Sequence, residues 1–295
     1  MLRRTAVALG IAVFALALGG GVSAQEGSGI DWQKGPAVGR LGNVAEIQVP
    51  EGYLFSGKEG TQRFLALTQN PTNGNELGVL VPDRNDESGH WFVIFEYHDT
   101  GYVKDDEKDQ LDADAILKSL KEGTEAANEM RKERGWELFH VTGWEKAPFY
   151  DTRTNNLTWA IRGRSSGGQE VSESVNYSVR VLGRGGTMNV DLVLSPTMVG
   201  ATVPEFEQLM GGFDYMKGQT YAEWVPGDKV AAYGLTALIA GGAGTALVKS
   251  GLLQKFWKLI VAGLVALLAG LRKLFQMMKR AASPERSPTE DTVRG

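Results

Sequence analysis

The residue types most able to do chemistry are concentrated in an acidic stretch that runs from Asp105 to Asp114. Carboxylates at alternate positions in such a stretch could bind Ca²⁺ or Mg²⁺. The spacing does not match a calcium-binding loop that starts at Asp105, because Gln110 and Ile116 stand where that loop needs glycine and glutamate. The other interpretation is a solvated loop that brings acids to a helix N-terminus, where negative charge is favoured. The candidate ligand-binding residues of this stretch are Asp105, Asp106 and Asp112.

A weaker metal hypothesis combines acids with histidine. His90, Glu96 and His98 share one face of a predicted strand. Its two ends lie too far apart for joint ligation, because a strand rises about 3.3 Å per residue. His98 with Glu96 or Asp99 stays conceivable, but isolated structural or surface histidines are the favoured interpretation. We expect no metal and no other cofactor, and the weak candidates are Asp105, Asp109 and His98.

Two arginines and several aromatic residues complete the candidates for ligand binding. Arg180 lies in a predicted strand, and Arg184 lies in the glycine-rich turn that follows it. Aromatic side chains among glycine and aspartate could line a groove for a cell-wall sugar. Packing in the core of a sheet explains most of them without a ligand. The candidates of this group are Arg180, Arg184, Trp144 and Tyr102.

Common catalytic motifs are absent or incomplete. Gly163–Gly167 has the letters of a nucleophile elbow, but strands flank it and all three histidines precede its serine. It is therefore interpreted as a hairpin turn. The absence of cysteine excludes disulfides, thiol catalysis, cysteine-ligated zinc and iron–sulfur clusters.

Strand-like and helical patterns alternate over residues 27–229 and must position these side chains. The clearest strand is His90–His98, which is aromatic and β-branched on both faces and so belongs centrally in a sheet. The clearest helix runs from Asp112, which can cap its start, to Arg134. Strands in runs with few helices predict one α+β domain with an antiparallel-rich sheet, one long helix and a few short ones. The other predicted strands are Ala45–Val49, Gly52–Phe55, Glu137–Trp144, Asn156–Arg162, Val175–Leu182 and Met188–Leu194, and the short helices are Thr61–Gln69 and Pro204–Met210.

The N-terminus has the pattern of a secretory signal peptide. Arg3 and Arg4 precede a short apolar run, and small residues stand before a cleavage site expected between Ala24 and Gln25. An uncleaved signal anchor is the alternative, although the apolar core is short for a span of about 20 residues. We therefore predict a signal peptide over residues 1–24 and an exported domain over residues 25–229.

Two apolar, uncharged runs near the C-terminus predict a membrane anchor. They are Val230–Val248 and Leu259–Leu271, and basic residues follow each of them. A helical hairpin is the favoured topology, a single span over about Gly251–Leu271 is the second, and a hairpin packed on the domain is the third. Glycines in the first run could let transmembrane helices pack closely and form oligomers. The predicted anchor covers residues 230–280, and residues 281–295 are predicted to be a disordered polar tail.

The distribution of charge agrees with this division. The net charge of the chain is −4, but residues 1–24 carry +2, residues 25–229 carry −12 and residues 230–295 carry +6. Two basic, apolar ends thus enclose an acidic domain, which argues against a nucleic-acid partner.

Eight ordered motifs resemble one bacterial family. They are WFVIFEY, TGYVKDDE, LDADAIL, AAN with Arg131 beyond it, TGWEKAPFYD, LTWAI, VNYSVRVLGR and YGLTALIAGGAG, and the match runs from about Gly39 to Gly244. The chain resembles the family of predicted membrane-anchored proteins that is known as a domain of unknown function. The resemblance implies an exported domain followed by a C-terminal membrane anchor, and it implies no reaction, cofactor or catalytic residue.

The leading functional hypothesis is a non-enzymatic binding or structural module of the cell envelope. It would be anchored in the inner membrane, with its domain in the periplasm, and its partners would be the bilayer and an envelope protein or cell-wall ligand. The alternative is a divergent hydrolase or metal-dependent enzyme that uses Asp105–Asp114. A third hypothesis treats the C-terminal helices as an assembly module.

Overall fold

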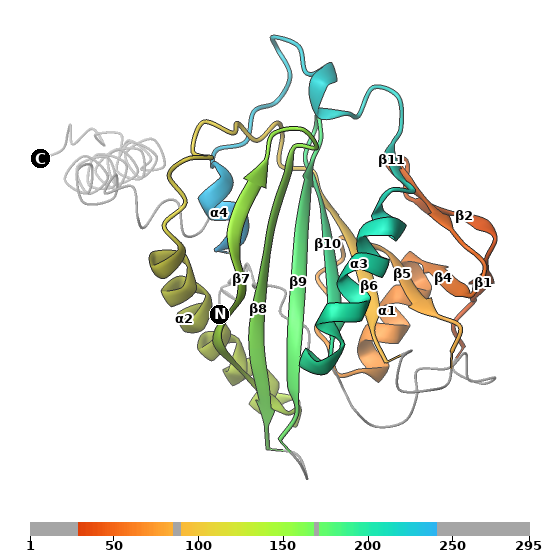
Figure 1. Ribbon diagram of the computed structural model, residues 1–295, viewed down its shortest axis with the longest axis vertical. Coiled ribbons are helices and arrows are strands. Elements are labelled where there is room, and N and C mark those ends of the chain that lie inside the picture. The colour runs from red at the N-terminus through yellow and green to blue at the C-terminus, as the bar shows by residue number, and fades with distance from the viewer. Residues whose placement is uncertain (1–28, 85–89, 168–170, 241–295) are drawn as a thin grey trace, which may run out of the picture. The chain divides into compact units, whose positions relative to one another are not determined.

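A large antiparallel sheet forms the centre of the domain that the structure describes (Figure 1). The computed structural model describes residues 29–84, 90–167 and 171–240. Eight strands follow the order β1-β4-β5-β6-β10-β9-β8-β7, and β2, β3 and β11 form a separate three-stranded sheet. The strands are β1 Gln33–Lys34, β2 Ala37–Leu41, β3 Ala45–Val49, β4 Tyr53–Gly57, β5 Glu76–Pro82, β6 Phe92–His98, β7 Leu138–Asp151, β8 Asn156–Ser166, β9 Glu173–Leu182, β10 Thr187–Leu194 and β11 Phe213–Tyr215. The α helices are α1 Lys58–Leu67, α2 Ala113–Glu133, α3 Val199–Met210 and α4 Leu235–Ile239.

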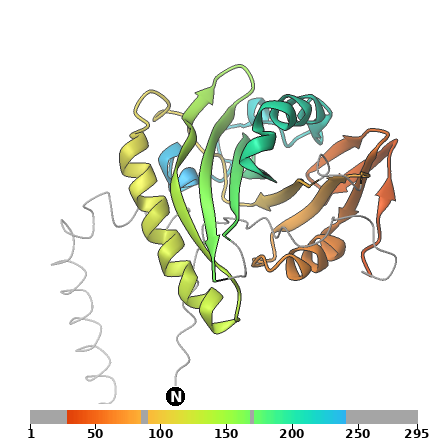
Figure 2. The same ribbon diagram turned by 60° about the horizontal axis from the view of Figure 1, so that its bottom comes forward.

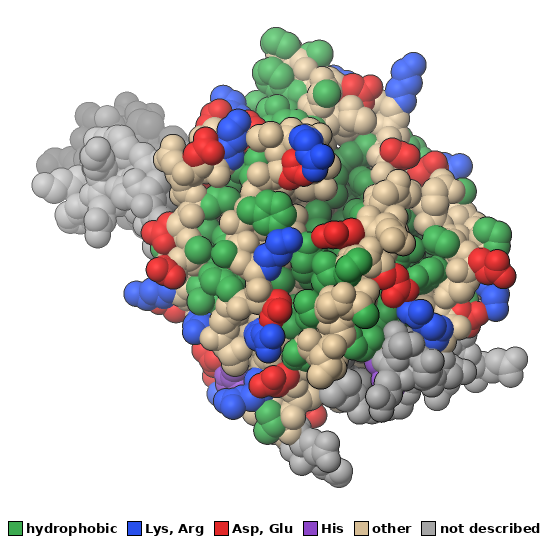
Figure 3. Space-filling view, viewed as in Figure 1, with side chains coloured by type: hydrophobic (Ala, Val, Ile, Leu, Met, Phe, Trp, Pro, Cys, Tyr) green, Lys and Arg blue, Asp and Glu red, His purple; other side chains and the backbone are tan. Residues whose placement is uncertain are grey.

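Helices cover both faces of the large sheet. On one face, α1 packs over β4–β6 and α2 packs over β7–β9, in two separate apolar clusters. On the opposite face, α3 and the small sheet pack against β9 and β10 in the largest cluster (Figure 2). We call the first the α1/α2 face and the second the α3 face. The space-filling view shows charged side chains of both signs on the outside of the α3 face and apolar ones in the furrow beside α3 (Figure 3).

The long helix α2 forms and docks through polar contacts as well as apolar ones. The Asp112 side chain caps its start by accepting a hydrogen bond from the Ala115 backbone N–H at 2.9 Å. The Asn128 side chain donates to the Phe139 carbonyl and accepts from the Phe139 N–H, both at 2.9 Å, and so binds the edge strand β7 as another strand would. Arg131 donates to the carbonyls of Gln69 and Glu137. The buried stripe of α2 is therefore apolar in its first half and polar in its second.

Most of the predicted elements are confirmed. The structure is an α+β fold with a large antiparallel sheet, β6 is a central strand, and β7–β10 form an antiparallel meander. Strand β7 continues to Asp151, beyond the predicted end at Trp144. The interior strand β5 was not predicted, because Gly78 and Pro82 interrupt its pattern. A Cβ at Gly78 would lie 2.6 Å from the Phe55 ring, so packing between the strands requires glycine there.

The C-terminal part of the described chain differs from the expected boundary at residue 229. Leu235 and Ile239 of α4 are buried in the cluster below α2, and the Thr236 N–H donates to the Glu107 carboxylate at 3.1 Å. The first apolar run therefore begins on the domain, as the packed-hairpin alternative expects for its start. In the part of the chain that the structure describes, none of the helices is long and apolar enough to cross a bilayer. The predicted signal peptide, residues 241–280 of the anchor and the polar tail lie outside the described residues.

A buried polar layer as the candidate site

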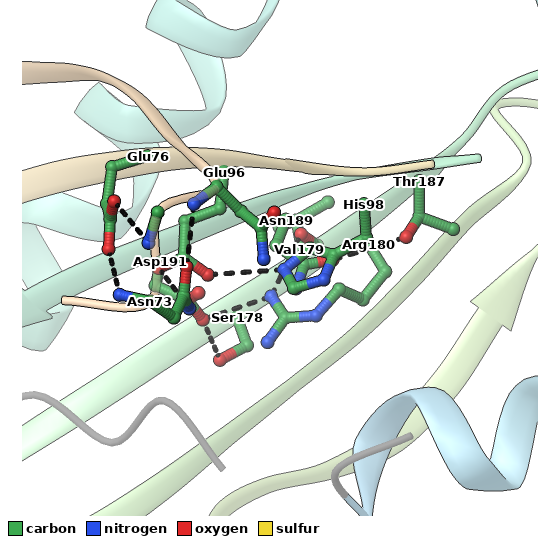
Figure 4. Close-up of polar contacts among 12 residues, drawn as sticks. Asn73, Glu76, Glu96, His98, Ser178, Val179, Arg180, Thr187, Asn189 and Asp191 are labelled. Atoms are coloured by element: carbon green, nitrogen blue, oxygen red, sulfur yellow. Dashed lines mark hydrogen bonds and ion pairs between the residues drawn. The ribbon is translucent and has the colours of Figure 1, made fainter. Parts of the chain in front are cut away.

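Polar side chains line up across three central strands on the α1/α2 face of the sheet (Figure 4). Glu96 of β6 and Arg180 of β9 both lie directly opposite Asn189 of β10. Asp191 lies opposite Ser178. Since directly opposed residues share a face, these strands present an unbroken row of polar groups. We call this row the polar layer, and its members are Glu96, His98, Ser178, Arg180, Asn189 and Asp191.

The polar layer lies between the two apolar clusters of its face. Ile94 and Val193, which neighbour the layer on β6 and β10, pack under α1. Trp159 and Leu157, which neighbour it on β8, pack under α2. On the α3 face, β9 and β10 carry apolar cluster residues such as Val179 and Val190. Because both faces of the sheet are covered here, the charged groups on the α1/α2 face are buried.

The most deeply buried charges of the layer are Asp191 and Arg180, with 0% and 5% of their surfaces exposed. Arg180 Nη1 donates to Asp191 Oδ1 at 3.0 Å and to the Val179 carbonyl at 3.3 Å. Ser178 Oγ donates to the same Asp191 oxygen. Among the described residues, Asp191 Oδ2 and Arg180 Nε have no hydrogen-bond partner. A buried charged group left partly unpaired is costly, so this pair needs a reason other than stability.

An aromatic ring lies beside the guanidinium of the arginine. The Arg180 guanidinium carbon lies 4.6 Å from the centre of the Trp159 ring. A cation over an aromatic face is attracted by about 2 kcal/mol when both are shielded from water. This contact and the Asp191 hydrogen bond hold the guanidinium in one orientation.

The opposite side of the layer is formed by Glu96 and His98. Glu96 is 1% exposed, and its carboxylate accepts a hydrogen bond from Asn73 Nδ2 at 3.1 Å and lies 3.4 Å from His98 Nε2. His98 and Asn189 are only partly buried, so solvent reaches the layer there. The neighbouring Glu76 is also fully buried, but its carboxylate accepts the backbone N–H groups of Asn73 and Gly74. Glu76 therefore stabilises the turn before β5.

The candidates predicted from the sequence lie in three separate places. Arg180 and His98 belong to the polar layer. Asp112 caps α2, and Trp144 Nε1 donates to the adjoining Ala113 carbonyl at 3.3 Å, so both hold the start of that helix. Asp106 and Asp109 are exposed.

The third place is the end of the sheet where the C-terminal segment crosses the loop after β6. Tyr102 stacks on Tyr221 at 4.4 Å and on Trp224 at 5.0 Å between ring centres. Burial, and after it the hydrogen bond to Tyr102, raise the pKa of Tyr221 above its usual value, and the carboxylate of Asp105 raises it further. Arg184 holds Asp228 through two hydrogen bonds. Tyr102 and Arg184 thus fasten one chain segment to another.

The acidic stretch does not gather into one cluster. The Asp105 carboxylate lies 3.7 Å from Lys108 Nζ, and Asp112 is used by the helix cap. Within residues 29–84, 90–167 and 171–240, no group of three or more histidine and acidic side chains is placed to hold a metal ion. The hypothesis of an enzyme that uses Asp105–Asp114 therefore gains no geometric support.

The sequence contains a signal for the polar layer that motif reasoning missed. In β9, Asn176, Ser178 and Arg180 alternate with valine and tyrosine, and in β10 Asp191 stands between Val190 and Leu192. A charged residue inside an otherwise apolar strand is rarely buried unless it is paired. Alternation of this kind in two successive strands predicts a polar face, but it does not show that the face is buried.

A family model described as a protein of unknown function, DUF2167, matches residues 33–272 of the chain. The chain belongs to this family. The match includes all strands of both sheets and extends into the predicted anchor. In this DUF2167 protein, the motif residues Asn128 and Arg131 hold α2 to the chain around β7, and Trp159 and Arg180 contact each other.

Similarity to characterised proteins is slight. None of the curated proteins matches this sequence. Among solved structures, the chain is similar to cyanobacterial PsbP from Synechocystis sp. PCC 6803, with a TM-score of 0.36 and 12% sequence identity, over 68% of this chain and 98% of that one.

Proposed function

We propose that this DUF2167 protein is a non-enzymatic binding module of the bacterial cell envelope, and that its ligand binds at the polar layer. The observation that carries the proposal is the buried pair of Arg180 and Asp191, in which Nε and Oδ2 have no partner among the described residues. Binding sites commonly contain such groups, because polar atoms that a ligand will satisfy cannot also be satisfied within the fold.

The proposal includes tethering to the inner membrane with the domain in the periplasm. The signal-peptide pattern of residues 1–24 and the apolar runs that follow the domain support it. Contacts hold the described chain to the domain up to Ala240. With the domain in the periplasm, its partner is a molecule of the envelope.

Thermal unfolding of the full-length protein in detergent tests the binding site. Fractions of a small-molecule extract of the envelope are added to wild type, to an Arg180→Met/Asp191→Leu double variant and to Asp228→Asn. Asp228→Asn is the matched control, because it weakens an arginine–aspartate pair outside the layer. A ligand at 100 times its Kd stabilises a protein by about 2.7 kcal/mol, which raises Tm by about 5–10 °C in a domain of this size.

The proposal predicts that at least one fraction stabilises wild type and the control but not the double variant. An equal shift for the double variant would place the ligand elsewhere, and no shift for any fraction would contradict a binding role.

Protease treatment of spheroplasts tests the tether and the side of the membrane. External protease should cleave the domain while the inner membrane is intact, and the domain should stay with the membrane fraction. Protection until lysis, or release of the domain without cleavage, would contradict the proposed location.

A further inference from the structure

We infer that Ser166 is a nucleophilic serine that takes up an acyl group from a reactive ester, with His140 as its general base. The inference goes beyond the proposed function, because it concerns another part of the domain and a covalent step. It follows from a chain of hydrogen bonds that joins a hydroxyl, an imidazole and a carboxylate at the edge of the large sheet.

Strands β7 and β8 place the hydroxyl beside the imidazole. Leu138 and His140 of β7 lie directly opposite Ser166 and Arg164 of β8. His140 and Ser166 are therefore diagonal neighbours on one face of the sheet. The distance between His140 Nε2 and Ser166 Oγ is 3.0 Å, which is within the range over which a general base takes the proton of a nucleophile.

A carboxylate lies on the other side of the imidazole. His140 Nδ1 lies 2.8 Å from Glu125 Oε1, and Glu125 Oε2 accepts a hydrogen bond from Asn128 Nδ2 at 3.1 Å. Asn128 is itself buried and bound to the Phe139 backbone. Both oxygens of Glu125 are thus held, although its side chain is 55% exposed. Glu125 is therefore the positioning residue of the imidazole.

The charge of Glu125 decides where the protons lie. The hydrogen bond with His140 holds the pKa of Glu125 below its usual value, so this group is ionised at neutral pH and only accepts hydrogen bonds. In the neutral imidazole the proton therefore lies on Nδ1, and Nε2 is the acceptor for the Ser166 hydroxyl. A general base for serine requires this tautomer.

Solvent reaches these groups, so a reactive compound meets them without entering the fold. The side chain of His140 is 31% exposed, and Ser166 is partly exposed at the end of β8. The nucleophile-elbow letters of the sequence pointed instead to Ser165, which is 2% exposed and lies on the opposite face of β8. A serine, a histidine and an acid of this kind are recognised by their geometry and not by their order in the chain.

The covalent step transfers one acyl group. Ser166 Oγ attacks the carbonyl carbon of the ester while its proton passes to His140 Nε2. The bond between the carbonyl carbon and the leaving oxygen then breaks, and the proton on Nε2 passes to that oxygen. The products are an acyl-serine and an alcohol or phenol, so the step needs no other reactant. Glu125 stabilises the imidazolium that forms between the two proton transfers.

Acetylation of the full-length protein in detergent tests this inference. The probe is p-nitrophenyl acetate, and tandem mass spectrometry of proteolytic peptides follows acetylation at each serine over time. We expect Ser166 to react faster than every other serine of the chain. His140→Gln should slow its acetylation about 100-fold, since a general base contributes at least that much.

The matched control is Ser165→Ala, which removes the neighbouring hydroxyl on the opposite face and should leave the acetylation of Ser166 unchanged. Acetylation of lysines, which does not involve His140, shows that the reagent is equally active with every variant.

Chemical rescue separates a role in the reaction from a role in folding. Added imidazole should restore acetylation of Ser166 in His140→Gly, and added formate should restore it in Glu125→Ala. Each compound replaces a missing group at a place that solvent reaches. Hydrogen bonds that only held α2 to β7 would give no such recovery of rate.

Three results would overturn the inference. They are acetylation of Ser166 no faster than that of other serines, an unchanged rate in His140→Gln, and slowed variants that neither imidazole nor formate restores. Ser166, His140 and Glu125 do not belong to the polar layer. Their failure would therefore leave the proposed function standing, and the envelope-fraction experiment decides that function separately.

Discussion

Two arginine–aspartate pairs, whose arginines lie close together in the chain, show how differently the same residue types are used. Arg180 and Asp191 are buried, share one hydrogen bond and leave Nε and Oδ2 unpaired among the described residues. Arg184 and Asp228 are partly exposed and share two hydrogen bonds, of 2.7 and 2.9 Å, and Asp228 also accepts the Val225 N–H. We call them the layer pair and the clasp pair.

The difference indicates which pair serves the fold. Both hydrogen bonds of the clasp pair are formed. The pair fastens the C-terminal segment beside the stacked rings of Tyr102, Tyr221 and Trp224. The layer pair is in the more costly environment but is less completely bonded, which stability alone does not favour. The clasp pair thus has the contacts of a structural pair, and the layer pair is the candidate site.

The largest expected effect comes from breaking the layer pair on one side. Asp191→Asn leaves the Arg180 charge buried without its counter-charge, which costs about 3–5 kcal/mol. Urea unfolding of the full-length protein measures this loss, and Asp228→Asn serves as the control. If the two variants lost equal stability, the contrast between the pairs would be wrong.

Replacing both members of the layer pair should be far less harmful than replacing one. In Arg180→Met/Asp191→Leu, apolar side chains of similar size remove the buried charges together, and we expect stability within about 1 kcal/mol of wild type. The same unfolding measurement gives the comparison. A double variant that is less stable than Asp191→Asn would show that the layer pair supports the fold.

A smaller effect is expected from the aromatic stack beside the clasp pair. Tyr102→Leu removes two ring contacts, each worth about 0.5–1.5 kcal/mol. Hydrogen exchange over residues 219–231 should become faster, while exchange in β9 and β10 stays as in wild type. Faster exchange throughout the sheet would mean that the stack supports the whole domain.

The smallest effect is the response of the clasp pair to acid. The hydrogen bond from Arg184 holds the pKa of Asp228 below its usual value of 3.8. A group whose pKa is lower in the folded state adds stability that is complete above the usual pKa and is lost as pH falls through the folded pKa. Exchange over residues 219–231, corrected for intrinsic rates, should therefore accelerate as the pH falls below 3.8. Asp228→Asn should abolish this dependence, and an unchanged pH profile in that variant would assign it to another group.

Local sequence patterns predicted most helices and strands but few of the contacts between distant segments. Asp112 as the cap of α2 and the central position of β6 followed from short-range signals, since a cap and an apolar strand depend on neighbouring residues. Asn128 and Arg131 gave no such signal, because their hydrogen bonds reach β7 and the end of α1. Strand β5 was missed because Gly78 is explained by the side chains of Phe55 and Leu41, which come from other strands.

By itself the sequence determined the α+β class with an antiparallel-rich sheet, the division of charge along the chain and the exclusion of cysteine chemistry. These depend on composition and on residues close together in the chain. Only the tertiary structure decided that β10 pairs with β6 as well as with β9, which joins Glu96, Asp191 and Arg180 into one buried layer. It also decided that Arg180 lies in that layer while Arg184 binds Asp228. Strand order and burial arise from the packing of distant segments, and no local pattern contains that information.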